Sequence, residues 1–165
     1  KSKYPIDIPI FDKLIDDRSK KIKQEKNKKD ILILEGWCCG CPKLEKKFLN
    51  KDINKLEMQE DKNRIWRNYY NNNLDNEYKK LFKLFDKTIF LKAPSFNFVL
   101  NWRLKQEMTN KSSDKYQIRM NKKEILYFIS HYEKITKWMI KKLPSIANLV
   151  VSINKKQEIT KIKFN

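Results

Sequence analysis

The sequence predicts an α/β fold, with a parallel sheet flanked by helices, in a chain of 165 residues. Short apolar runs at 31–34, 88–91 and 148–153 do not alternate with polar residues, which is typical of strands covered on both faces. Segments with helical periodicity separate these runs, so the order is strand, helix, strand, helix, helix, strand. Because 40% of the residues are hydrophobic, we expect residues 1–165 to form a single domain with its own core.

The N-terminal residues are mixed in character and contain two prolines. In residues 1–18, Pro5 and Pro9 favour an extended backbone. Residues 19–30 form a lysine-rich run, for which a solvated helix or loop is the simplest expectation. The first strand, 31–34, follows this run.

The middle of the chain is expected to be mostly helical. Residues 36–48 are predicted to turn into a helix with Pro42 near its first turn, and residues 49–64 to be polar and irregular. An amphipathic helix fits 64–85, and core packing is the expected role of its apolar side. That side consists of Trp66, Tyr70, Leu74, Tyr78, Leu81, Phe82 and Phe85.

The C-terminal half carries the clearest boundary signals. A serine-capped helix is expected over 95–109. Asn121, with Glu124 three residues later, predicts a capping box that starts a helix running to about residue 142. After the third buried strand and a turn, residues 158–164 are expected to add an edge strand.

The net charge of +18 points to a polyanionic partner, but the kind of basic residue argues against nucleic acid. Only five of the 38 basic residues are arginine, the residue best suited to bidentate phosphate and base contacts. The charge is therefore attributed mainly to a Lys- and Asn-rich composition. A basic nucleic-acid-binding module is kept as the alternative function. No membrane association is expected, because no apolar run approaches the roughly 20 residues of a membrane helix.

Three cysteines lie close together in the sequence. Cys38, Cys39 and Cys41 are too near one another for an unstrained disulfide framework, and there is no distant cysteine to pair with. A zinc site would need a fourth ligand, and the single histidine, His131, is far along the chain. Small buried thiols in a reducing cytoplasm are the favoured interpretation.

Glu35 ends the apolar run Ile-Leu-Ile-Leu and precedes a glycine and a tryptophan. In parallel α/β sheets, ligands bind beyond the carboxyl ends of the strands, which is where this carboxylate is expected. A carboxylate at a buried strand end needs a cation, a proton or a hydrogen-bond donor nearby. Glu35 is therefore either a functional acid or a strand cap paired with a lysine, and these residues alone leave both interpretations open.

An ordered set of motifs resembles the D-glycerate 3-kinase family, a branch of the P-loop kinases related to uridine kinase and phosphoribulokinase. The resemblance covers nearly the whole chain. The matching stretches are Ile8-Pro9-Ile10-Phe11-Asp12-Lys13 with Asp17-Arg18; Leu34-Glu35-Gly36-Trp37 with Gly40; Asn54, Leu56-Glu57, Glu60-Asp61 and Trp66-Arg67; Ala93-Pro94-Ser95-Phe96, Trp102-Arg103 and Gln106-Glu107; and Tyr132-Glu133, Thr136 and Leu143-Pro144.

This resemblance implies that ATP, with Mg²⁺, phosphorylates the 3-hydroxyl of D-glycerate or a similar hydroxy acid. Glu35 would hold the magnesium ion and act as a catalytic carboxylate, and Asp12 would orient or deprotonate the substrate hydroxyl. Arg18 would bind the substrate carboxylate, although Leu14 stands where family members usually have a serine. The alternative without a catalytic role is that the Asp12–Lys13 and Asp17–Arg18 pairs are exposed ion pairs that contribute little to stability.

The resemblance also implies contacts from the second half of the chain. Arg103 corresponds to lid arginines that touch the ATP phosphates, and Gln106 would support the same site. Asp61 and Glu107 are implied as substrate or supporting contacts. The alternative for Arg103 is a pair with Glu107, four residues along the same helix.

The largest departure from the family is the missing Walker A loop, G-x-x-x-x-G-K-[ST], which cradles the ATP phosphates. The two glycines, Gly36 and Gly40, are not followed by Lys-Ser or Lys-Thr. The chain begins at Lys1 and not at a methionine. We therefore expect the P-loop, and the family's strand that precedes it, to lie on a segment outside this chain. A C-terminal fragment or a split gene is favoured over an inactive relative, and a kinase-like interaction subunit is a further alternative. This chain alone is predicted not to turn over ATP.

Overall fold

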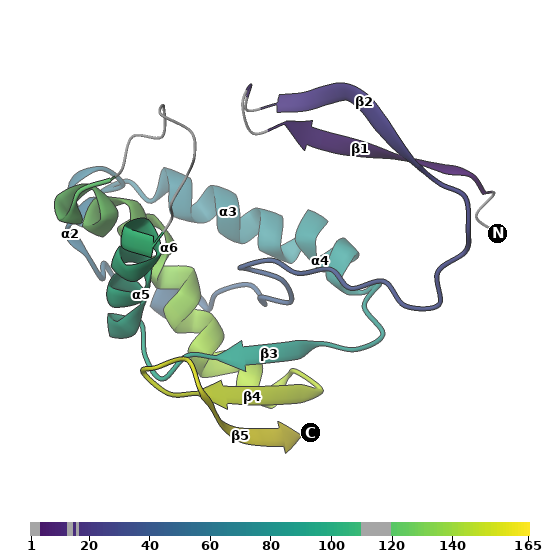
Figure 1. Ribbon diagram of the computed structural model, residues 1–165. Coiled ribbons are helices and arrows are strands. Elements are labelled where there is room, and N and C mark those ends of the chain that lie inside the picture. The colour runs from purple at the N-terminus through teal and green to yellow at the C-terminus, as the bar shows by residue number, and fades with distance from the viewer. Residues whose placement is uncertain (1–3, 13–14, 16, 110–119) are drawn as a thin grey trace. The chain divides into compact units, whose positions relative to one another are not determined.

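The computed structural model describes residues 4–12, 15, 17–109 and 120–165, without the side chains of residues 107–109. The chain divides into two compact units, Lys1–Glu35 and Gly36–Asn165, and each is described by itself. Figure 1 draws both units and labels most of their helices and strands. Within the described residues, no helix is long and apolar enough to cross a membrane.

The first unit contains an antiparallel hairpin of β1 (Ile6–Asp12) and β2 (Asp17–Glu25). The lysine-rich run was expected to be a helix or loop, and that expectation was wrong for its first part, because β2 continues to Glu25. Cross-strand pairing decides the outcome: Ile8 lies opposite Lys23, and Gln24 Nε2 donates to Asp7 Oδ1 at 3.2 Å. A lysine-rich segment can form a strand here because its side chains extend into solvent from an exposed ribbon.

The predicted strand at 31–34 is absent, which corrects the sequence-based expectation. Ile31, Leu32 and Ile33 are 80%, 90% and 85% exposed instead of buried. A strand exists only through hydrogen bonds to a neighbouring strand, and none of the described residues pairs with this run. Its β-branched, apolar residues favour a strand, but no strand in the part of the chain that the structure describes pairs with them.

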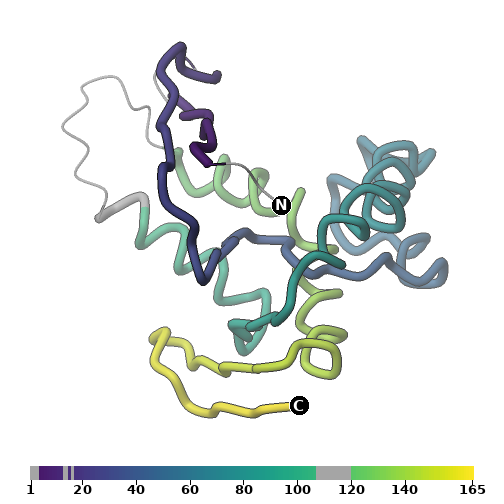
Figure 2. Tube along the Cα trace, turned by 90° about the vertical axis from the view of Figure 1, so that its right-hand side faces the viewer, coloured from purple at the N-terminus to yellow at the C-terminus, as the bar shows by residue number. Residues whose placement is uncertain are grey.

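The second unit is built on a three-stranded sheet in the order β3-β4-β5. β3 (Ile89–Lys92) pairs in parallel with β4 (Leu149–Ile153), which confirms the predicted α/β class with a parallel strand pair. β5 (Ile159–Phe164) returns antiparallel to β4, as Figure 2 shows at the yellow end of the tube. The sheet is thus mixed, with the predicted 158–164 segment as an edge strand.

The helices differ from the predicted ones mainly in their length, and one predicted helix is divided at an asparagine. The expected single helix over 64–85 is two helices that meet at Asn76, whose side-chain Nδ2 donates to the Asn72 carbonyl at 2.8 Å. The expected helix over 36–48 is a turn followed by one short helix. The helical elements are α1 (Lys46–Asn50), α2 (Lys55–Gln59), α3 (Ile65–Asp75), α4 (Glu77–Phe82), α5 (Asn97–Thr109), α6 (Lys122–Lys142) and the 3-10 turn Leu143–Ser145.

The predicted capping box at the start of α6 is confirmed. Asn121 Oδ1 accepts from the amides of Lys123 and Glu124 at 2.9 and 3.1 Å, and Glu124 Oε2 accepts from the Asn121 amide at 2.7 Å. These bonds satisfy amides that have no partner within the helix.

The core of the second unit lies between α6 and one face of the sheet. Trp138 of α6 is its largest apolar member; its ring stacks on Phe48 at 5.1 Å, and its Nε1 donates to the Pro42 carbonyl at 3.1 Å. The helix and the sheet bury their apolar faces against each other, so they hold α5 and the loops after β3 and β4 in place. The cluster comprises Cys41, Leu44, Leu49, Leu74, Phe90, Ile135, Trp138, Met139, Leu143, Ala147 and Val150.

Candidate functional site

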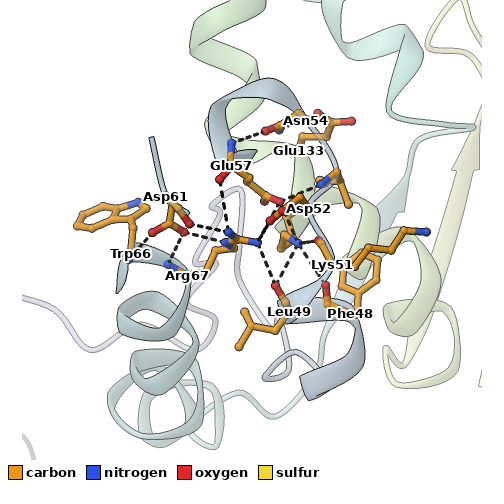
Figure 3. Close-up of polar contacts among 12 residues, drawn as sticks. Phe48, Leu49, Lys51, Asp52, Asn54, Glu57, Asp61, Trp66, Arg67 and Glu133 are labelled. Atoms are coloured by element: carbon orange, nitrogen blue, oxygen red, sulfur yellow. Dashed lines mark hydrogen bonds and ion pairs between the residues drawn. The ribbon is translucent and has the colours of Figure 1, made fainter. Parts of the chain in front are cut away.

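Two parts of the second unit combine charge with defined geometry: a buried charged cluster around Arg67, and an open depression on α5. The charged cluster consists of Arg67 and Lys134, each 2% exposed, with Asp52, Glu57 and Asp61. Figure 3 shows the Arg67 guanidinium at its centre, with the carboxylates and carbonyl groups around it.

Arg67 connects α3 to the segment before it through all of its nitrogens. Its Nε donates to Asp61 Oδ2 at 2.7 Å, its Nη1 to Asp52 Oδ1 at 2.6 Å, and its Nη2 to the Asp61 carbonyl at 2.6 Å. Burial alone would lower the pKa of Arg67, but the hydrogen bonds to Asp61 and Asp52 outweigh it, and the pKa is raised. The guanidinium therefore stays charged inside the fold.

Lys134 holds the C-terminal end of α1. Its Nζ donates to the carbonyls of Phe48, Leu49 and Lys51 at 3.2, 3.3 and 2.5 Å and lies 3.1 Å from Glu57 Oε2. These carbonyls have no partner within so short a helix, and an ammonium group is well suited to the negative end of its dipole. Burial lowers the pKa of Lys134, and Glu57 opposes that shift.

Asp61, which the resemblance implies as a substrate contact, is occupied inside this cluster. Its side chain is buried and accepts from the amides of Trp66 and Arg67 at 3.0 and 3.2 Å as well as from the guanidinium. Burial alone would raise the pKa of Asp61, but these bonds lower it. A direct substrate contact stays a prediction that this geometry does not favour, because it would break the pair with Arg67.

The open depression has a volume of about 500 Å³ and is lined by α5 and the turn after β4. Its lining residues are Val99, Trp102, Arg103, Lys105, Gln106 and Gln157. Arg103 Nη1 donates to Gln106 Oε1 at 2.7 Å, and its guanidinium carbon lies 5.5 Å from the centre of the Phe128 ring. Trp102 Nε1 donates to the Lys155 carbonyl at 2.9 Å and so ties the helix to the turn.

The structure thus brings together Arg103 and Gln106, the two residues predicted from the sequence to contact ATP. Sequence reasoning missed Lys105 and Gln157 as lining residues of the depression. The turn after the third strand was predicted, and Gln157 has a left-handed backbone there, with φ of 67°. Only the fold could place that turn beside α5, since the two are some fifty residues apart in the sequence.

The depression has the chemistry to receive an anionic ligand with an apolar part. Arg103 and Lys105 supply positive charge, and Trp102 supplies an aromatic ring. All three residues belong to α5 and line the depression. Gln106 holds the Arg103 guanidinium in one orientation through a short hydrogen bond. A positioned guanidinium is the group proteins use most often for bidentate recognition of phosphate or carboxylate.

The remaining predicted site residues belong to the first unit. Asp12 is half-buried and lies opposite Asp17, while the exposed Arg18 lies opposite Phe11. Successive pairs in an antiparallel ribbon point to alternate faces, so Asp12 and Arg18 project from opposite faces of the hairpin. Glu35 is the last residue of this unit and is exposed.

Comparison with known proteins finds a curated relative similar in sequence and solved structures similar in fold. No family model matches the chain. The protein called "uncharacterized kinase mug58" of Schizosaccharomyces pombe is 27% identical over 135 residues, which are 77% of this chain and 47% of that protein. The structure of D-glycerate 3-kinase from Cryptococcus neoformans matches 97% of this chain with a TM-score of 0.72 and 24% identity.

The chain has a D-glycerate 3-kinase-like fold. A second structure, that of the YGR205w protein, matches 96% of the chain with a TM-score of 0.61 and 20% identity. The chain covers 60% and 57% of these two solved chains and about half the length of the curated relative. The resemblance identified from the motifs is confirmed at the level of the fold.

The structure describes only some of the residues in the ion pairs that were the alternatives to a functional role. Lys13 and the side chain of Glu107 lie outside the described residues, so the pairs proposed for Asp12 and Arg103 with them stay predictions. The backbone amide of Arg18 donates a hydrogen bond to Asp17 Oδ1 at 2.6 Å.

The tryptophans and cysteines were expected to be core residues or buried thiols. Trp66 is exposed, so the core packing expected for it is wrong; Trp37 is also exposed, and its Nε1 donates to Thr136 Oγ1 at 2.9 Å. Cys41 is buried, and burial raises its pKa to about 12, so its thiol stays protonated. Among the described residues, no group of histidine, cysteine and acidic side chains could hold a metal ion by itself.

Proposed function

We propose that this chain is the C-terminal part of an ATP-dependent small-molecule kinase. The reaction we infer transfers a phosphoryl group from ATP to the 3-hydroxyl of D-glycerate or a similar hydroxy acid. The observation that carries the proposal is the juxtaposition of Arg103 and Gln106 at the depression on α5. The family resemblance independently implies both residues as ATP contacts.

The depression fits the anionic part of a nucleotide. Phosphoryl transfer requires mainly positioning and neutralisation of charge on the phosphate oxygens. The Arg103 guanidinium, oriented by Gln106 and by the face of Phe128, is the group we assign to the ATP phosphates. Lys105 adds a second cation on the same helix. Bound ATP would supply the phosphoryl group, and these side chains would orient it and neutralise its charge.

Magnesium would be held by Glu35 together with the nucleotide. Mg²⁺ usually binds to one or two protein carboxylates and completes its shell with phosphate oxygens and water. A single exposed carboxylate such as Glu35 therefore fits the ion, and a cluster of protein ligands is not required. We assign Glu35 both the metal contact and the catalytic role of a fixed negative charge beside it.

The acceptor substrate would be bound by the hairpin of the first unit. Arg18 is the candidate for the carboxylate of the hydroxy acid, and Asp12 is the candidate to orient or deprotonate the hydroxyl group. The two side chains project from opposite faces of the ribbon, so this hairpin does not bring both to one small molecule, and each role is tested by its own variant. Arg18→Ala should raise KM for the acceptor, and Asp12→Asn should lower kcat.

Turnover would require a segment carrying the motif G-x-x-x-x-G-K-[ST], which this sequence does not contain. We call the chain joined to such a segment the completed kinase. A reducing cytoplasm is the compartment we propose, since the thiols are free.

The proposal is tested with a coupled assay of ADP release, using ATP, Mg²⁺ and D-glycerate. We expect no turnover above background for the 165-residue chain and robust turnover for the completed kinase. Robust turnover by the chain alone would refute the requirement for the second segment. A completed kinase that is folded but inactive with D-glycerate and with related hydroxy acids would refute the proposed reaction.

A further inference from the structure

One face of the three-stranded sheet is apolar and exposed. Residues paired across a sheet point to the same face. Ile89 lies opposite Leu149, which lies opposite Phe164, and Leu91, Val151 and Ile162 form the next row. Ile89, Leu91, Ile162 and Phe164 are exposed, whereas Phe90 and Val150, which point to the other face, are buried in the core. Two rows of large apolar side chains therefore lie on the face that does not pack on α6.

The two edges of this sheet differ in a way that predicts where a further strand would add. Edge strands are commonly protected by lysine, and β5 follows this rule with Lys161 and Lys163 alternating with its apolar residues. β3 contains three apolar residues in a row and a lysine only at its end. Since β3 pairs only with β4 among the described strands, its outer backbone groups are open to pairing along an edge that carries no such protection.

The comparisons indicate the kind of polypeptide that could occupy this edge. The fold match extends over 97% of this chain but only 60% of the Cryptococcus D-glycerate 3-kinase, and the curated relative is matched over 47% of its length. Proteins with this fold thus carry substantial polypeptide that has no counterpart here. Contiguous rows of exposed, large apolar side chains are typical of an interaction site. These rows adjoin an edge suited to strand addition.

We propose that the outer edge of β3 and the apolar face beside it form a docking surface for the polypeptide that the relatives have and this chain does not match. The docked polypeptide adds a strand beside β3 through main-chain hydrogen bonds and covers the rows of Ile89 and Leu91 with apolar side chains. This inference rests on the kinase-like fold and not on the proposed reaction, because it concerns binding and can be tested without turnover.

The test uses the unmatched portion of the Cryptococcus D-glycerate 3-kinase as the probe. The 165-residue chain is expressed together with that portion, and the complex is isolated through a tag on the probe. We expect a 1:1 complex by light scattering. We also expect hydrogen exchange of the β3 amides to be at least tenfold slower in the complex than in the chain alone.

A matched pair of variants makes the test specific to the surface. Leu91→Lys places a charge on the proposed docking face and should weaken binding at least tenfold. Leu84→Lys makes the same change at another exposed position, outside the sheet and after α4, and should leave binding unchanged. Urea unfolding followed by the fluorescence of the four tryptophans, of which Trp138 lies in the core, reports whether each variant stays folded. If Leu91→Lys does not fold, Ile89→Lys takes its place.

Several results would overturn the inference. Purification of the probe without the chain would overturn it, and so would binding that does not slow exchange in β3. Equal binding by Leu91→Lys and Leu84→Lys would also overturn it. Concentration-dependent protection of β3 in a dimer of the chain would assign the surface to a second copy instead. Protection of β3 in the monomeric chain alone would assign it to the chain's own first unit. A complex that forms but does not phosphorylate D-glycerate would leave the docking surface in place and contradict only the reaction.

Discussion

Arg67 and Lys134 share one carboxylate: Glu57 Oε2 lies 3.5 Å from Arg67 Nη1 and 3.1 Å from Lys134 Nζ. The two cations come from different helices, α3 and α6, and both are almost completely buried. Through Glu57 on α2, this contact joins α2 and the next helix, α3, to α6, which lies far along the sequence. It fixes the path of the chain between α1 and α3 with charge and not with apolar packing.

Removing this carboxylate should destabilise the fold strongly. Glu57→Gln leaves two buried cations facing a neutral amide, and breaking a buried ion pair from one side costs about 3–5 kcal/mol. Urea unfolding followed by tryptophan fluorescence measures the loss. The control is Glu77→Gln, whose pair with Lys80 is exposed and should contribute below about 1 kcal/mol. Equal stability of the two variants would contradict the role assigned to the charged cluster.

The charged cluster also predicts a dependence of stability on acid. Hydrogen bonds from Arg67 and Trp66 lower the pKa of Asp61 below its ordinary value of 3.8. A carboxyl group with a lowered pKa contributes stability above its unfolded-state pKa and loses it as the pH falls through the folded-state pKa. The free energy of unfolding should therefore drop below about pH 4. Asp61→Asn should be less stable at neutral pH and show a shallower acid drop, and an unchanged slope would argue against this assignment.

The start of α6 offers a milder test of local structure. Asn121→Ala removes the side-chain acceptor for two helix amides and should cost about 1 kcal/mol. The neighbouring exposed Lys122→Ala serves as the control and should change stability by less than about 0.5 kcal/mol. Thermal or urea unfolding distinguishes them. If both variants unfold alike, the capping box contributes nothing measurable.

Glu35→Gln separates the kinase from the nucleic-acid-binding alternative. In the completed kinase, the loss of the carboxylate should abolish phosphorylation of D-glycerate, because the proposed metal contact is removed. In the 165-residue chain, the same change should leave binding to a DNA or RNA oligonucleotide intact or improve it, since it removes a negative charge. Full kinase activity in the variant would refute the metal role, and tight, steeply salt-dependent oligonucleotide binding would favour the alternative.

Elements with strong local signals were predictable from the sequence. The capping box at Asn121 and the β-branched, apolar runs at 88–91 and 148–153 correspond to α6, β3 and β4 with small shifts in their ends. Each depends on residues close together in the chain, such as a cap or an apolar stripe. The resemblance implied that Arg103 and Gln106 serve one site, but the hydrogen bond between them was not predicted, because Glu107 was the partner named for Arg103.

Other features depend on distant partners that periodicity does not reveal. The run at 31–34 has the composition of a strand but forms none, because strand formation requires a neighbour. The burial of Lys134 could not be predicted, since only the folded chain brings the carbonyls of Phe48, Leu49 and Lys51 to its ammonium group. The lysines of β2 form a strand because β1 pairs with them.

The account depends most on Arg103 acting on ATP from the depression on α5. The most direct measurement is kcat/KM for ATP in the completed kinase with Arg103→Ala, and Lys87→Ala on the exposed loop before β3 is the control. We predict a fall of about 10²–10³-fold for Arg103→Ala, the size expected when a positioned cation is lost from a phosphoryl-transfer site. No change is expected for the control. Activity within twofold of the unsubstituted enzyme would contradict the proposed role of the depression.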